Sequence, residues 1–239
     1  MTARIIAVMS PKGGVGKTTV SVNLSAALGL LGKKVLIIDT NLDTPHVAIY
    51  YGFVGYKYSL EDVLNGLATV SDAVYKTDED NVDILPSRVI KGLGDGNASY
   101  KLINVFHHIK KLGENYDYII LDSRPSSGID VVKLINGVEA LIVTMPEIAS
   151  IIEAKKLNEA CIGARIKVVG LVVNKTNKRA LAAMSEGEIR SLVEIERLWK
   201  VPEDHAVFAA LRRGVPIVVS DKKNGVSRAF MDLARAITR

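Results

Sequence analysis

The sequence predicts an α/β fold of three layers, in which a mostly parallel central sheet is covered by helices on both faces. Short runs of apolar, mainly β-branched residues recur along the chain, and stretches with apolar residues at helical spacing separate them. Strands that are apolar throughout are typical of a parallel sheet buried on both faces. The 239 residues, 48% of them hydrophobic, suit one domain spanning residues 1–239.

The alternating pattern predicts individual strands and helices in a definite order. We expect strands at Arg4–Met9, Lys34–Asp39, Val82–Leu85, Tyr118–Asp122, Ala140–Thr144 and Lys167–Asn174. We expect helices at Val20–Leu31, Tyr100–Leu112 and Ile148–Ala160. Ligands of such sheets bind beyond the carboxyl ends of the strands, so the residues that follow each strand are the candidates for a site.

The first strand leads directly into a glycine-rich turn and the start of a helix. Residues 10–19 read Ser-Pro-Lys-Gly-Gly-Val-Gly-Lys-Thr-Thr. Glycines let consecutive backbone N–H groups turn toward an anion, and the N-terminus of the next helix adds its dipole. A lysine here reaches the outer phosphates, and a threonine hydroxyl suits Mg²⁺. This P-loop predicts nucleotide binding by Lys12, Gly13, Gly14, Val15, Gly16, Lys17, Thr18 and Thr19, with catalytic roles for Lys12 and Lys17.

One position departs from the strict P-loop pattern. Pro11 replaces the first glycine, and a second lysine, Lys12, precedes the remaining glycines. This arrangement resembles the deviant Walker A motif of the MinD/ParA family of dimerising ATPases. The resemblance implies ATP and Mg²⁺ as cofactors and a homodimer that forms on ATP binding, in which Lys12 reaches the nucleotide of the partner. It extends from Arg4 to Ile237 and is closer to MinD than to plasmid ParA.

The strand that ends at Asp39 is followed by Thr40-Asn41-Leu42-Asp43. A carboxylate here can hold Mg²⁺ through water or orient an attacking water, so Asp39 is a candidate for metal binding and catalysis. The family pattern is Asp-x-Asp, and Asn41 stands where the second, water-activating aspartate is found. An amide cannot accept a proton, so we expect slow hydrolysis; Asp43 is a second candidate carboxylate. The alternative is a nucleotide-dependent binding or scaffold module with little or no turnover.

A second apolar strand also ends in a carboxylate. Tyr118–Asp122 has the Walker B arrangement, and we expect Asp122 to support Mg²⁺ together with Thr18. The loop that follows, from Ser123 to Gly128, lies where a switch segment senses the γ-phosphate. Arg124 in this loop is a candidate contact for phosphate or for an interface, and a solvated arginine is the alternative.

Three further stretches resemble family motifs. Asn174-Lys175 resembles the pair that contacts adenine, and an asparagine amide can pair with an adenine edge. Pro202-Glu203-Asp204 resembles the loop that borders the base. Thr144–Ser150 resembles a turn of MinD-like members.

Composition limits the partners and the location. The chain carries a net charge of +5 and one cysteine, Cys161, which excludes a disulfide framework and an internal Cys-x-x-Cys site. It shows no signal peptide and no apolar run of membrane-spanning length, so we expect a cytoplasmic protein. The apolar residues at Val226, Phe230, Leu233 and Ile237 predict a core helix rather than a membrane anchor.

These features favour a nucleotide switch for intracellular spatial organisation, either placing the division site or partitioning chromosomes or other cargo. A protein activator or cargo adaptor is then expected. Basic pairs at Lys33-Lys34, Lys110-Lys111, Arg212-Arg213 and Lys222-Lys223 leave nonspecific DNA as an alternative scaffold. A redox enzyme on the same scaffold is disfavoured, because one cysteine cannot bridge an iron–sulfur cluster.

Overall fold

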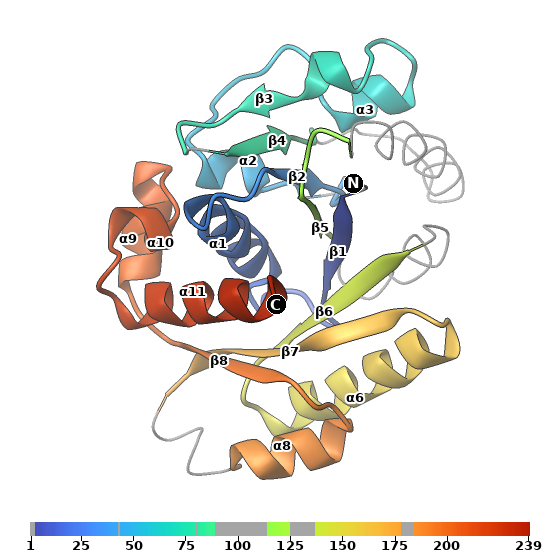
Figure 1. The fold of residues 1–239 in the computed structure, drawn as a ribbon, viewed down its shortest axis with the longest axis vertical. Helices are drawn as coiled ribbons and strands as arrows, with labels where there is room; N and C mark the ends of the chain where they lie inside the picture. The colour runs from blue at the N-terminus through green and yellow to red at the C-terminus, as the bar shows by residue number, and fades with distance from the viewer. Residues whose placement is uncertain (1–2, 43, 80, 89–113, 125–136, 178–183) are drawn as a thin grey trace.

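The computed structural model describes residues 3–42, 44–79, 81–88, 114–124, 137–177 and 184–239. Within them, eight strands form one sheet in the order β3-β4-β2-β5-β1-β6-β7-β8 (Figure 1). The strands are β1 (Arg4–Met9), β2 (Val35–Asp39), β3 (Tyr75–Lys76), β4 (Val82–Leu85), β5 (Tyr118–Asp122), β6 (Val138–Thr144), β7 (Lys167–Thr176) and β8 (Leu198–Pro202). The helix expected at Tyr100–Leu112, Asp43 and the loop residues after Arg124 lie outside the described residues.

Helices lie between the strands in the chain, and three more follow the last described strand, β8. They are α1 (Lys17–Leu30), α2 (Val47–Tyr50), α3 (Leu60–Leu64), the 3₁₀-helix η1 (Ser71–Ala73), α6 (Ile148–Gly163), α8 (Glu186–Val193), α9 (Ala206–Arg213), α10 (Ile217–Ser220) and α11 (Gly225–Ile237). Each described helix is either too short or too polar to serve as a bilayer-crossing segment.

The sheet is parallel except at one edge. Each described strand pair runs parallel apart from β3, which lies antiparallel to β4. The expected mostly parallel sheet is therefore confirmed, and all six expected strands are present. Two strands were not expected: β3 has two residues, and in β8 a lysine and a terminal proline interrupt the apolar run.

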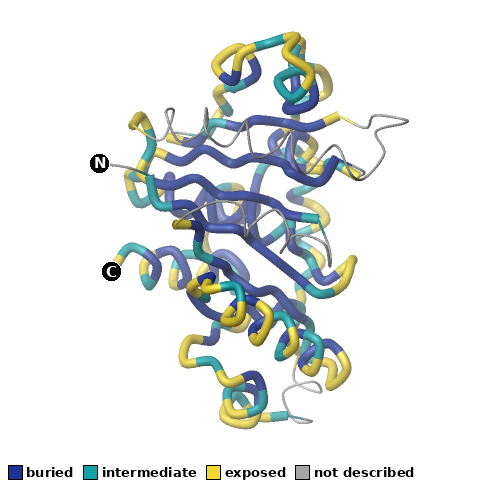
Figure 2. Tube along the Cα trace, turned by 90° about the vertical axis from the view of Figure 1, so that its right-hand side faces the viewer, coloured by how far each residue is buried: buried dark blue, intermediate teal, exposed yellow. Residues whose placement is uncertain are grey.

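Helices cover both faces of the sheet, and the strands between them are buried (Figure 2). Helices α1, α2, α9, α10 and α11 pack on the face to which Ile6 and Val8 of β1 point. Helices α3, α6 and α8 pack on the other, which Ile5 and Ala7 face. Because adjacent β1 residues point to opposite, buried faces, the strand is apolar from Ile5 to Met9.

Helix α11 belongs to the core. Its four apolar residues Val226, Phe230, Leu233 and Ile237 are all at most 1% exposed, and they lie in the same cluster as α1. The expectation of a core helix is confirmed.

The single tryptophan lies on β8 against a glycine of β7. A Cβ built on Gly170 would lie 2.4 Å from Cζ3 of Trp199. Gly170 therefore leaves the space that the indole ring occupies, and this contact holds β8 against β7 near the end of the sheet.

Candidate functional site

Three neighbouring strand ends meet at the glycine-rich turn. The order β2-β5-β1 places Asp122 of β5 between the other two strands, paired in register with Asp39 of β2 and Val8 of β1. The turn begins directly after β1, so both carboxylates lie beside it. The expected gathering of residues 12–19, Asp39 and Asp122 is present in the structure.

The turn is bound to the end of β7. Gly16 has a φ of 91°, and a Cβ there would lie 2.2 Å from Nδ2 of Asn174. The same amide nitrogen donates to the carbonyl of Val15 at 2.8 Å, and Lys175 Nζ donates to the carbonyl of Gly14 at 3.2 Å. Glycine is therefore needed at position 16 for two reasons: the backbone is left-handed there, and Asn174 approaches too closely for a Cβ.

Asp122 is held by two hydroxyls of helix α1. Thr18 Oγ1 donates to Asp122 Oδ2 at 2.6 Å, and Ser21 Oγ donates to Oδ1 at 2.9 Å. Lys17, next to Thr18, is 8% exposed. Burial lowers the pKa of Lys17, while the charges of Asp122 and Asp39 oppose this shift.

Asp39 anchors the start of α2. Its Oδ1 accepts from the backbone N–H of Asn41 at 3.0 Å, and its Oδ2 accepts from those of His46 and Val47 at 2.8 and 3.0 Å. Burial and the nearby charge of Asp122 raise the pKa of Asp39 to about 8, while these three N–H groups oppose the shift. The carboxylate therefore fixes the loop between β2 and α2.

Asn41 is engaged within this loop. Its Nδ2 donates to the carbonyl and the hydroxyl oxygen of Thr44 at 2.9 and 3.0 Å. The side chain thus closes the turn after β2, and it also lines the cavity described below.

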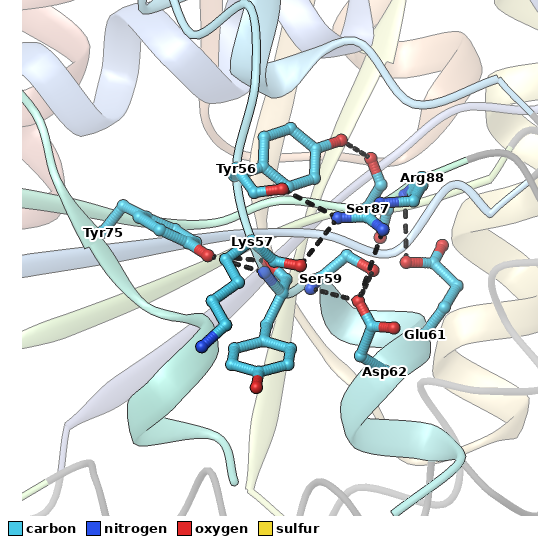
Figure 3. A network of polar contacts seen from close by, with 9 residues as sticks. Tyr56, Lys57, Ser59, Glu61, Asp62, Tyr75, Ser87 and Arg88 are labelled. Atoms are coloured by element: carbon cyan, nitrogen blue, oxygen red, sulfur yellow. Dashed lines mark hydrogen bonds and ion pairs between the residues drawn. The ribbon is translucent and has the colours of Figure 1, made fainter. Parts of the chain in front are cut away.

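The end of β4 supports the same loop from behind. Ser87 Oγ donates to the carbonyl of Asp39 at 2.5 Å, and Tyr56 Oη donates to the carbonyl of Ser87 at 2.5 Å. Arg88 Nη2 donates to the carbonyl of Tyr56 at 2.8 Å, and the backbone N–H of Arg88 donates to Glu61 (Figure 3). This network ties the chain between α2 and α3 to the strand beside Asp39.

A cavity of about 540 Å³ opens over the turn, a size typical of small-molecule sites. One half is polar and is lined by Gly13, Gly14, Gly16, Lys17, Thr18, Thr19, Asn41, Thr44, His46, Asn174 and Lys175. The other half is mostly apolar and is lined by Ile49, Tyr50, Val201, Pro202, Glu203, Asp204, Val207, Phe208, Leu211 and Val226. A phosphate-binding turn that continues into an apolar slot fits a nucleotide.

Lys12 lies to one side of this cavity. Its Nζ is 3.1 Å from Oε1 of Glu153 on α6, and Lys12 is not one of the residues that line the cavity. Asp39, Asp122 and Val15 lie behind the lining residues.

The oxygen ligands present fit Mg²⁺. The Thr18 hydroxyl lines the cavity, and the buried carboxylates of Asp122, to which it donates, and of Asp39 beside it are further hard oxygen ligands. No group of three or more His, Cys, Asp or Glu side chains suited to a metal gathers within the described residues. These few oxygen ligands suit a Mg²⁺ ion that is held by one or two protein oxygens and completes its coordination with phosphates and water.

Sequence reasoning missed several residues of this site. Tyr50, Thr44 and His46 follow Asp39 in a stretch without clear periodicity, and Phe208 belongs to a short helix after β8. Glu153 lies three residues after the recognised Thr144–Ser150 turn, and nothing in its position indicates an ion pair with Lys12. The strand character of Val201 and Pro202 was also missed.

Comparison with known proteins agrees with this geometry. A family model described as "AAA domain" matches residues 3–159. An uncharacterised ATP-binding protein of Methanocaldococcus jannaschii is 33% identical over 99% of this chain and 89% of its own length.

Two solved structures are also similar. The septum site-determining protein MinD of Pyrococcus horikoshii, complexed with Mg-ADP, superposes with a TM-score of 0.86 at 30% identity, covering 98% of this chain and 96% of that one. The MinC:MinD cell division protein complex of Aquifex aeolicus gives 0.85 at 29% identity, covering 99% and 96%. With the P-loop, the two carboxylates and the parallel sheet in place, the chain belongs to the MinD/ParA family of P-loop ATPases.

Proposed function

We propose that this protein is a Mg-ATP-dependent ATPase that dimerises on ATP binding and acts as a nucleotide switch. The position of Lys12 is the observation that carries the proposal. A lysine that belongs to the phosphate-binding turn lies outside its own cavity, against Glu153 of α6. Such a lysine is available to the phosphates of a second copy, where it neutralises charge that forms during phosphoryl transfer.

The remaining residues provide nucleotide binding within one copy. The backbone N–H groups of residues 13–16 and the side chain of Lys17 bind the phosphates, and the apolar half of the cavity accepts the base. Asn174 and Glu203 border that half, where a contact with adenine remains a prediction. Mg²⁺, held near Thr18, Asp122 and Asp39, supplies charge neutralisation for the phosphates when bound.

Slow hydrolysis follows from the chemistry of Asn41. Its amide cannot accept a proton, and its Nδ2 is already bound to Thr44. The alternative is a binding or scaffold module with little or no turnover. Single-turnover hydrolysis with radiolabelled ATP separates the two, since a module without turnover retains its ATP after many hours.

The cellular role we propose is spatial organisation inside the cell, with cell division as the leading process. The two related structures are of a septum site-determining protein and of a complex of two cell division proteins. A protein partner that binds the ATP dimer, as activator or cargo adaptor, is consistent with these relatives. Nonspecific DNA is the alternative scaffold, for which exposed Arg212, Arg213, Lys222 and Lys223 are available on either side of α10.

Sedimentation velocity tests the switch. The wild-type chain is expected to sediment as a dimer with Mg-ATP and as a monomer with Mg-ADP. Lys12→Ala should remain monomeric with ATP while still binding it, and Lys223→Ala, which removes an exposed lysine far from the turn in sequence, should behave as wild type. An undiminished ATP dimer in Lys12→Ala contradicts the role given to Lys12.

Retention on duplex DNA at two salt concentrations separates the scaffolds. Retention that requires ATP and falls steeply with salt indicates DNA partitioning. Absence of retention in both nucleotide states favours a protein partner.

A further inference from the structure

Two consecutive tyrosines at the end of α2 have different surroundings. Tyr50 lines the cavity, and its hydroxyl oxygen lies 2.8 Å from Oγ1 of Thr19 in helix α1. Tyr51 is 6% exposed, and its hydroxyl donates to the carbonyl of Val22 at 3.2 Å in the core. The second tyrosine is thus part of the packing, whereas the first presents a polar group to the cavity.

The two adjacent threonines of α1 have different partners. Thr18 Oγ1 donates to Asp122, on the side where Mg²⁺ is expected. Thr19 Oγ1 pairs with Tyr50, so the pair joins a residue of the polar lining to one of the mostly apolar lining, which also includes Ile49 and Phe208. We expect a nucleotide that places its outer phosphates at Lys17 and its base in the apolar half to pass this pair with the phosphate nearest its sugar.

A count of donors shows that the hydroxyl pair can bind an anion. Each hydroxyl has one hydrogen to donate and can also accept. One hydrogen is used between Thr19 and Tyr50, and within the described residues no other side-chain partner is found for either group. One O–H therefore remains free to donate. Burial raises the pKa of Tyr50, so its hydroxyl keeps its proton at neutral pH.

We infer that Tyr50 extends the P-loop: its hydroxyl joins that of Thr19 in one binding unit for the nucleotide phosphate nearest the sugar. The inference rests on the proposed nucleotide-binding function and deepens it. Because ATP and ADP share this phosphate, Tyr50 contributes equally to both. It therefore sets how tightly the nucleotide is held, whereas Lys12 distinguishes the states of the switch.

The test compares Tyr50→Phe with Tyr51→Phe as the matched control. Each change removes one hydroxyl and keeps the ring, one at the cavity and one in the core. Isothermal titration with Mg-ATP and with Mg-ADP should show that Tyr50→Phe weakens both by about tenfold or more, the loss expected when a hydrogen bond to a charged group is removed. Tyr51→Phe should leave both dissociation constants unchanged.

The outcomes separate the inference from the function on which it rests. A wild-type chain that binds neither nucleotide overturns the proposed function itself. A wild-type chain that binds both, with Tyr50→Phe equal to it, overturns the inference alone. Loss of ATP affinity without loss of ADP affinity overturns it also, because the contact would then involve the γ-phosphate. An effect that disappears with 2′- or 3′-deoxy-ATP places the contact on the sugar and likewise overturns it.

A double-mutant cycle with Thr19→Val tests whether the hydroxyls act as a unit. Valine keeps the branched shape of threonine without its hydroxyl. Coupling predicts that the double variant binds nucleotide hardly more weakly than the worse single variant. If the losses of nucleotide affinity in the two single variants add up in the double variant, the two hydroxyls make independent contacts, and the inference that they act as a unit is wrong. Thermal unfolding without nucleotide identifies any variant that fails to fold, and if Thr19→Val does so, Thr19→Ala, which also lacks the hydroxyl, replaces it in the cycle.

Discussion

Lys12 Nζ lies 3.1 Å from Glu153 Oε1, so the lysine that distinguishes this P-loop is held by helix α6 of its own chain. The other oxygen of that carboxylate, Oε2, is buried and has no hydrogen-bond partner within the described part of the chain. In the proposed dimer, Lys12 has to leave Glu153 before it contacts the second copy. We therefore expect the ion pair to oppose dimer formation.

Glu153→Gln should strengthen the ATP-dependent dimer. The amide keeps the shape and removes the charge that holds Lys12. Both side chains are about one-third or more exposed, so the expected gain is modest, about two- to fivefold in the dimer dissociation constant. Sedimentation at several concentrations measures it, and Glu159→Gln on the same helix is the control. A weaker dimer would show that Glu153 contributes to the interface instead.

Asn41→Asp should raise the rate of ATP hydrolysis and lower stability. A carboxylate can accept a proton, but it cannot donate to the carbonyl of Thr44 as the amide does. The lost bond should cost about 1 kcal/mol of the free energy of unfolding. Asn41→Ala is the control, because it removes the same bond without supplying a base. If the two variants hydrolyse ATP equally slowly, the missing base does not belong at this position.

Gly16→Ala should abolish nucleotide binding and destabilise the fold. The added Cβ would lie 2.2 Å from Asn174 Nδ2, at a φ of 91°. Gly32→Ala is the matched control, since Gly32 has a φ of 77° and open space around it. Gly32→Ala should lower the free energy of unfolding by about 1 kcal/mol, from backbone strain alone. Equal losses of stability in the two variants, measured by urea unfolding, would show that Asn174 moves aside without cost.

Asp39→Asn should gain stability relative to the wild-type nucleotide-free protein as the pH rises. At every pH it also loses N–H bonds, because an amide has one acceptor oxygen where Asp39 uses two. The folded state raises the pKa of Asp39 to about 8 through burial and the charge of Asp122, whereas the unfolded chain ionises near 4. Folding therefore favours the protonated acid, and its contribution to stability is lost as the pH rises from about 4 through 8. Thermal unfolding at pH 5, 6.5 and 8 without Mg²⁺ measures the difference in stability between the two proteins, which should shift in favour of Asp39→Asn by ~1–3 kcal/mol between pH 5 and pH 8. Parallel pH profiles for the two proteins would contradict this.

The features that could be predicted from the sequence are those that short stretches of chain determine by themselves. A buried parallel strand is mainly apolar on both faces, so β4 was recognisable from Val82, Ile84 and Leu85 even though Asp83 interrupts the run. The P-loop was equally clear, because its turn needs glycines at fixed spacing. Asp39 and Asp122 followed from their places at strand ends.

Contacts made by tertiary packing were not predictable in the same way. The hydroxyls of Thr19 and Tyr50 meet across 31 residues, and no local pattern indicates that α2 lies beside α1. The pair of Lys12 with Glu153 depends likewise on where α6 packs. Strand β8 was missed because the sheet edge tolerates Lys200 and a terminal proline, which break the apolar run.

The contact of Trp199 with Gly170 has a practical consequence. The chain's one indole lies on the strand that ends at Pro202, which lines the cavity, and it rests on β7, which ends beside Asn174 and Lys175. Its emission therefore originates from a single, known place between two strands whose ends line the cavity. The molecule thus carries an intrinsic optical reporter close to the proposed nucleotide site, and we expect rapid-mixing experiments to follow nucleotide exchange without an attached dye.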